Sequence, residues 1–248
     1  MNMLRSLKPM RQYIILASDG YLGGVHDFYF HDDSWVIRYM VVDIGNWLAG
    51  RKVLLTTEVL GKADWDAHTL PVNLTRDQIE KSPEIDTDKP VSRRQEAELH
   101  KHFGWRSYWN ISGADLPPAL TEVGNAEPGD PHLRSFHEVT HYSIHAIDGP
   151  LGHIDDFIVE DAGWVIRYLV VNLSNWAPAR KVLISPQWMR EINFAQKTVE
   201  VALAREAIVN CPEFHPTDAV NREYEERLYD YYGRPIYWTE SGSCHEKK

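Results

Sequence analysis

Histidine is the residue type whose number and spacing first suggest chemistry in this sequence. The 248 residues include 12 histidines and 2 cysteines, and neutral imidazole is both a zinc ligand and a general base. His137, His141 and His145 are four residues apart, which would place them on one face of a helix. In a strand the same spacing spans about 13 Å per step, too far to share an ion. Because this segment leads into a predicted strand, we favour solvated or interface histidines over a metal site.

A second cluster of possible ligands or bases lies near a predicted hairpin. It comprises His26, His31, Asp32 and Asp33. It has neither zinc-type spacing nor a nucleophile motif. One alternative hypothesis is nevertheless a metal- or small-molecule-binding enzyme that uses histidines found in only one part of the chain. The candidates for that role are His100, His102, His141 and His145.

An internal repeat bears directly on these candidates. Positions 4–109 align with positions 133–238 without a gap, and WVIRY occurs at both 35–39 and 164–168. No histidine or cysteine aligns with the same residue type in the other repeat. A duplicated site built on either residue type is therefore excluded. A repeat of this length matches a whole domain rather than a solenoid unit.

The repeat predicts four segments. Residues 1–109 form the first domain and residues 131–238 the second. Between them, residues 110–130 are rich in proline, glycine and acidic side chains, which is typical of a linker. The polar residues 239–248 are expected to be a disordered tail.

Each repeat has the pattern of a small β domain with added helices. Apolar segments at 13–17, 25–30, 35–43, 51–55 and 69–74 predict strands. Two capping boxes, Thr75 with Gln78 and Ser92 with Gln95, predict helix starts. Gly104 should end the second helix in a left-handed conformation. Both faces of strand 35–43 are apolar, so each needs a cover. We therefore predict a mainly β fold with α additions, in which two tandem small β-barrels are each followed by a short helical extension.

Three motifs give the sequence a family resemblance. They are DGYLG at 19–23 with DGPLG at 148–152, Asp27-Phe28, and W-x-x-R-Y-x-V-V-D at 35–43. Together they resemble the PRC-barrel domain of the photosynthetic reaction-centre H subunit, which is shared with the ribosome-maturation factor RimM. The resemblance covers residues 13–74 and 142–203. It implies an all-β barrel that acts as an interaction module, without a known catalytic site to carry over. We expect no cofactor.

Two sets of residues shared by the repeats are candidates for structural or binding roles. Arg38 lies on an apolar strand face beside the strand of Asp27, and Arg167 and Asp156 repeat this arrangement, which predicts two structural ion pairs. The dipeptides Asn46-Trp47 and Asn175-Trp176 lie in predicted loops. Their tryptophans either plug the end of their own barrel or anchor a partner.

These observations predict a non-enzymatic protein–protein interaction or assembly module without a metal. The partner is a protein not identified by the sequence, the two repeats pair about a pseudo-twofold axis, and a homo-oligomer is possible. The net charge of −10 disfavours nucleic acid, although RimM-like RNA or ribosome association remains an alternative. No apolar run reaches membrane-spanning or signal-peptide length, so we expect a cytoplasmic protein without a membrane span.

Overall fold

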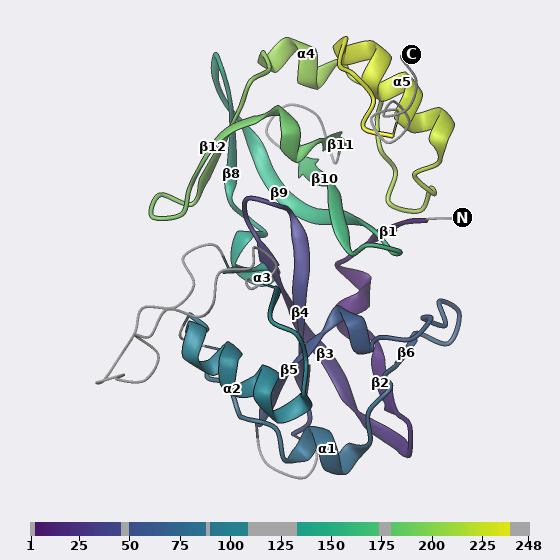
Figure 1. Cartoon of the computed structure of the whole chain (residues 1–248). Helices are drawn as coiled ribbons and strands as arrows, with labels where there is room; N and C mark the ends of the chain where they lie inside the picture. Colours follow the sequence, from purple (N-terminus) through teal and green to yellow (C-terminus); the bar gives the residue numbers. More distant parts are fainter. Residues whose placement is uncertain (1–2, 46–49, 88–89, 109–132, 174–179, 239–248) are drawn as a thin grey trace, which may run out of the picture. The chain divides into compact units, whose positions relative to one another are not determined.

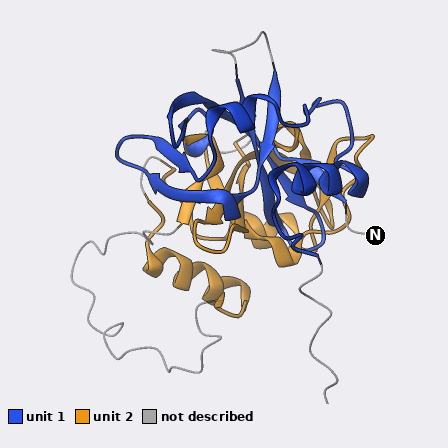
Figure 2. Cartoon of the chain, turned by 90° about the horizontal axis from the view of Figure 1, so that it is seen from above, with its two compact units in different colours: residues 1–7, 139–248 blue, residues 8–138 orange. Residues whose placement is uncertain are grey.

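The chain forms two compact units (Figure 2). Unit 1 consists of Met1–Leu7 and Val139–Lys248, and unit 2 consists of Lys8–Glu138. The computed structural model describes residues 3–45, 50–87, 90–108, 133–173 and 180–238. The predicted linker 110–130 and tail 239–248 therefore lie outside the described residues.

Unit 2 is built on a mostly antiparallel sheet (Figure 1). The central strand β3 pairs with β2 at its start, with β7 at its end, and with β4 along its other edge. Strand β5 extends the sheet beyond β4, while β6 runs parallel to β2. The strand bounds are β2 Ile14–Ala17, β3 Gly20–His31, β4 Val36–Asp43, β5 Lys52–Thr56, β6 Thr69–Pro71 and β7 Leu133–Ser135.

Four helical segments belong to unit 2. They are η1 (Pro9–Gln12), η2 (Thr57–Val59), α1 (Arg76–Glu80) and α2 (Arg93–Phe103). Both predicted capping boxes are confirmed, because in each the capping side chain and the glutamine three residues later hold each other's backbone N–H. Helix α2 ends at Gly104, whose φ of 70° is the predicted left-handed conformation.

Unit 1 repeats most of this order of elements and adds the strand β12. Strand β9 pairs with β8, β10 and β1, and β11, β13 and β12 complete the sheet. Its elements are β1 Leu4–Ser6, β8 Ser143–Ala146, β9 Gly149–Glu160, β10 Val165–Asn172, β11 Lys181–Ile184, η5 Pro186–Trp188, β12 Met189–Asn193, β13 Thr198–Val201, α4 Arg205–Val209 and α5 Arg222–Tyr232. Helix α3, Phe136–Val139, spans the boundary between the two units.

The strand ladders differ from the closed barrels predicted above. Among the described residues the ladder of each unit is open: in unit 2 it runs from β6 through β2, β3 and β4 to β5, and in unit 1 from β12 through β13, β8, β9 and β10 to β11. The mainly β composition with helical additions is as predicted. The predicted apolar cover also exists in unit 2, where Tyr39, Val41 and Leu54 of the sheet form one buried cluster with Leu99 of α2.

The division into units also differs from the predicted domain bounds. By sequence, β1 begins the first repeat and β7 begins the second. In the structure β1 pairs with β9 in unit 1, and β7 pairs with β3 in unit 2. Each unit therefore combines most of one repeat with the first strand of the other. Sequence alignment could not reveal this exchange, because it compares the repeats but not the pairing of their strands.

Candidate functional site

The most deeply buried polar cluster in unit 2 centres on Glu96 of α2. Its side chain is fully buried and accepts hydrogen bonds from the hydroxyls of Tyr39 (2.8 Å) and Tyr108 (2.9 Å). Arg93, one helical turn earlier, lies 3.0 Å from the other carboxylate oxygen. A buried carboxylate needs such partners to offset its desolvation. The cluster therefore fixes α2 to strand β4.

The same cluster recurs in unit 1 at the aligned positions of the second repeat. Glu225 accepts from the hydroxyls of Tyr168 (2.7 Å) and Tyr237 (2.8 Å), and Arg222 lies 3.1 Å from it. The glutamate, the arginine and the C-terminal tyrosine are among the charged and aromatic residues that both repeats keep. Their recurrence in the same contacts indicates that both repeats keep the same attachment of a helix to the sheet. We call each cluster a lock: Tyr39, Arg93, Glu96 and Tyr108 in unit 2, and Tyr168, Arg222, Glu225 and Tyr237 in unit 1.

The tyrosines of the two locks are poor candidates for proton transfer. Burial, followed by the negative charge of Glu96, raises the pKa of Tyr39 and of Tyr108 above the usual value. Burial likewise raises the pKa of Tyr168 and of Tyr237. These phenols are therefore protonated hydrogen-bond donors at neutral pH. Their chemistry suits holding a carboxylate rather than reacting with a substrate.

The structure gives Arg38 and Arg167 partners other than those expected. The guanidinium of Arg38 lies 4.6 Å from the ring centre of Tyr108. Arg167 lies 4.3 Å from the ring centre of Tyr237 and is hydrogen-bonded to Glu160 through Nε at 2.7 Å. These are cation–π contacts with the tyrosines of the two locks.

The expected partners of these arginines, Asp27 and Asp156, instead hold the exchanged strands. Asp27 lies opposite Val41 in the sheet, and it accepts from Ser135 Oγ (2.5 Å) and from the backbone N–H of His137 (3.0 Å). The predicted pairs of Asp27 with Arg38 and Asp156 with Arg167 are therefore replaced by other contacts. The sequence could not reveal this, because Ser135 and His137 belong to the other repeat and are distant from Asp27 in the chain.

Asp156 has the equivalent role in unit 1. It accepts a hydrogen bond from the hydroxyl of Ser6 and a second, at 2.7 Å, from the N–H of Phe157. Both aspartates are nearly fully buried. Burial raises the pKa of Asp27, while the bonds from Ser135, Phe28 and His137 act in the opposite direction.

The DG-x-LG motif has a structural explanation in both repeats. Asp19 accepts from the N–H of Arg76 at the start of α1 (2.8 Å), and Asp148 does the same for Arg205 at the start of α4 (2.8 Å). The last glycine of the motif, Gly23, packs so closely that a Cβ atom there would lie 2.1 Å from the carbonyl oxygen of Asp43. The motif thus positions a helix and a strand.

His100 is a feature of unit 2 alone, since its counterpart in unit 1 is Tyr229. Its Nε2 lies 2.8 Å from the Tyr39 hydroxyl and its Nδ1 lies 3.1 Å from the carbonyl oxygen of Arg106. Burial lowers the pKa of His100 below 6.5. The imidazole therefore extends the Glu96 lock rather than facing solvent.

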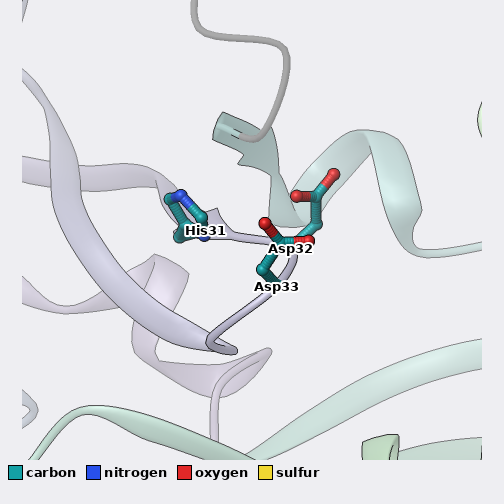
Figure 3. A group of neighbouring side chains, drawn as sticks. All are labelled: His31, Asp32 and Asp33. Carbon is teal, nitrogen blue, oxygen red and sulfur yellow. The ribbon is translucent and has the colours of Figure 1, made fainter.

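One group of possible metal ligands was found in the described part of the chain: His31, Asp32 and Asp33 at the hairpin turn (Figure 3). One ligand atom from each lies within 4.8 Å of the others. However, the Asp32 carboxylate is engaged by Arg134 Nε at 2.9 Å, which competes with a cation for its oxygen. The aligned residues in the other repeat are Glu160, Asp161 and Ala162.

The other candidate histidines have separate surroundings. His137 Nδ1 lies 3.1 Å from Arg11 in unit 2, and His102 Nε2 lies 3.0 Å from the carbonyl oxygen of Gln78. In unit 1, His141 stacks on His153 with ring centres 6.4 Å apart. His145 lies on β8, and no three-residue ligand group including it was found among the described residues.

The predicted partner-binding residues Asn46, Trp47, Asn175 and Trp176 lie outside the described residues. None of the helices described in the structure is both long and apolar enough to cross a membrane. No protein-family model and no curated protein matches the chain.

Proposed function

We propose that this protein is a non-enzymatic assembly module built from two PRC-barrel-like repeats, and that it binds a protein partner. The observation that carries the proposal is the use of the polar residues common to both repeats. Glu96, Tyr39 and Tyr108 lock a helix to a sheet, and Glu225, Tyr168 and Tyr237 do the same. The retention of these contacts after duplication supports a structural role for them, because the phenols are buried and protonated and the carboxylate is already engaged by two hydroxyls and an arginine.

In this proposal Trp47 and Trp176 contact the protein partner. Trp47 and Trp176 occur at equivalent positions of the two repeats, and tryptophan is among the most frequent anchors of protein interfaces. The test immobilises the full chain, captures partners from its source cells and identifies them by mass spectrometry. We expect the Trp47→Ala/Trp176→Ala variant to lose partners that wild type retains. Equal capture by both proteins would remove the tryptophans from the proposal.

The competing hypothesis of a metalloenzyme is tested independently. Elemental analysis of purified protein should show no transition metal near one equivalent per chain. Stoichiometric metal that disappears in a His31→Ala variant would contradict the non-enzymatic proposal and assign the ion to the hairpin turn of Figure 3. A His102→Ala variant is the matched control, because His102 lies outside that turn.

Pairing of the two repeats within one chain is part of the same proposal. Small-angle scattering of the monomer at low concentration is the direct measurement. One compact particle is the expected result. A two-lobed particle whose lobes vary in separation would contradict the pseudo-twofold pair while leaving partner binding open.

A further inference from the structure

Two short strands of identical sequence complete the two units. Strand β1 is Leu4-Arg5-Ser6 and strand β7 is Leu133-Arg134-Ser135. We refer to these three-residue strands as the arms. Each arm pairs antiparallel with the end of a long strand: Leu4 lies opposite Glu160, and Leu133 lies opposite His31. The two registers are equivalent in the alignment of the repeats, so both arms are recognised in the same way.

The recognition includes a buried acidic group in each unit. Asp27 accepts from the hydroxyl of Ser135, and Asp156 accepts from the hydroxyl of Ser6. At the hairpin turn of unit 1, Asp161 accepts from the backbone N–H of Met3 at 2.9 Å and donates its own N–H to the carbonyl oxygen of Met3 at 3.0 Å. Main-chain pairing supplies affinity in this mode of recognition, and pockets for side chains supply specificity.

Nothing in the local chain requires an arm and its receptor strand to come from one molecule. Ser6 and Asp156 are far apart in the sequence and belong to different repeats. The arm is also short: three ladder pairs and the backbone bond from Leu7 N–H to the Phe157 carbonyl (2.9 Å) attach it to β9. A molecule that carries both an arm and a receptor for the same arm sequence can satisfy every contact by reciprocal exchange with a copy.

We propose that the arm site on β9 accepts residues 4–6 of a second copy of this chain, so that two chains associate by exchanging β1. This proposal rests on the assembly function proposed above and names one partner for it. Every hydrogen bond of the exchanged arm is one that the single chain already makes. The exchange is therefore governed by protein concentration relative to the effective concentration of the chain's own arm, which is in the millimolar range for flexible tethers.

The register of β1 on β9 provides a covalent test. The backbone bonds at Leu7 and Asp161 make Leu4 and Glu160 a non-hydrogen-bonded pair, whose Cα atoms are about 4.5 Å apart in antiparallel sheets. That distance suits a disulfide. Leu4→Cys and Glu160→Cys are introduced into separate full-length chains, both in a Cys244→Ser background. The double variant in one chain serves as the control for arm placement.

The two single variants are mixed at high concentration, unfolded in urea, refolded together and oxidised. We expect a disulfide-linked dimer of one Leu4→Cys chain with one Glu160→Cys chain, at least about tenfold above either homodimer. An excess of synthetic peptide of residues 1–9 should suppress it, whereas the same peptide with Arg5→Pro should not, since proline lacks the N–H for pairing.

Two results would overturn the exchange. In the first, the double variant closes its disulfide within one chain while the mixture gives no selective interchain product. In the second, the Leu4→Cys/Glu160→Cys double variant forms no disulfide, which would show that the arm does not lie on β9. Either result leaves the proposed assembly function standing if the capture experiment finds a tryptophan-dependent partner, so the two failures are distinguishable.

Discussion

At the scale of single residues, the polar groups shared by the repeats are mainly engaged in holding elements together. Glu96 and Glu225 each accept from two tyrosine hydroxyls and contact one arginine. A buried charge of this kind adds little net stability over an apolar core but is costly to break. Its removal is therefore a sensitive test of the lock.

Substitution of the central carboxylate should destabilise each unit strongly. Glu96→Ala leaves the hydroxyls of Tyr39 and Tyr108 without their acceptor, so we expect a loss of about 3 kcal/mol in the free energy of unfolding, measured by urea denaturation. Glu225→Ala should act similarly in unit 1. Glu98→Ala is the matched control, because the half-exposed Glu98 pairs with the exposed Arg94, and its loss should cost less than about 0.5 kcal/mol. Equal effects at positions 96 and 98 would contradict the lock.

His100 should make the stability of unit 2 depend on pH. Burial lowers its pKa below 6.5, so the unfolded chain binds a proton that the folded chain does not. The stability from this group is fully present above about pH 6.5 and is lost as pH falls toward the folded pKa. The melting temperature, measured between pH 5 and 8, should therefore fall less steeply toward acid pH in a His100→Tyr variant than in wild type. Tyrosine is chosen because Tyr229 occupies the equivalent position in unit 1. Parallel curves for the two proteins would refute this linkage.

At the scale of elements, the repeated glycine of the DG-x-LG motif sets how closely two chain segments approach. A Cβ atom at Gly23 would lie 2.1 Å from the Asp43 carbonyl oxygen, and one at Gly152 would lie 2.1 Å from that of Asn172. Backbone atoms cannot move aside as the end of a flexible side chain can. The motif is therefore explained by packing in both units, independently of any ligand.

The neighbouring glycine offers a matched comparison for this explanation. Gly23→Ala should destabilise the protein by about 3 kcal/mol or more, because the sheet must distort to admit the methyl group. At Gly24 the nearest atom to an added Cβ is 3.8 Å away, so Gly24→Ala should change stability by less than about 1 kcal/mol. Urea denaturation of both variants measures the difference. A Gly23→Ala protein as stable as wild type would show that the close approach is not required.

At the scale of the whole molecule, the notable feature is that each unit includes the first strand of the other repeat. Unit 1 contains Met1–Leu7 together with Val139–Lys248. Leu7, which directly follows the arm β1, is fully buried, so the segment Met1–Leu7 contributes apolar burial in addition to the ladder of β1. The stability of unit 1 should therefore depend on residues that precede unit 2 in the chain.

Deletion of residues 1–7 should loosen unit 1 selectively. The N–H of Asp161 loses its acceptor on Met3, and burial of the Leu7 side chain, worth about 2 kcal/mol, is lost. Hydrogen exchange followed by mass spectrometry should show at least about tenfold faster exchange in a peptide covering residues 157–163. The equivalent peptide 28–34 in unit 2 should be unchanged, because its arm, β7, is intact. Equal acceleration of both peptides would contradict an effect confined to unit 1.

The amino-acid sequence by itself determined the local elements of this protein. Capping boxes and C-terminal glycines predicted α2 and its end, because these signals act through hydrogen bonds within a few residues. The gapless alignment of the two repeats predicted that both halves contain the same elements, and Glu96 and Tyr108 were already among the shared residues. Only the structure showed that they contact each other, because the chain after α2 turns back and places the Tyr108 hydroxyl beside Glu96.

Only the tertiary structure decided which distant segments meet. Asp27 and Arg38 lie on neighbouring strands, and sequence reasoning paired them, but the bulged register sets Asp27 opposite Val41 and leaves Arg38 over Tyr108. The sequence likewise did not predict that β1 pairs with β9 and β7 with β3. An identical tripeptide offers the same hydrogen bonds to either hairpin, so its partner depends on how the whole chain folds.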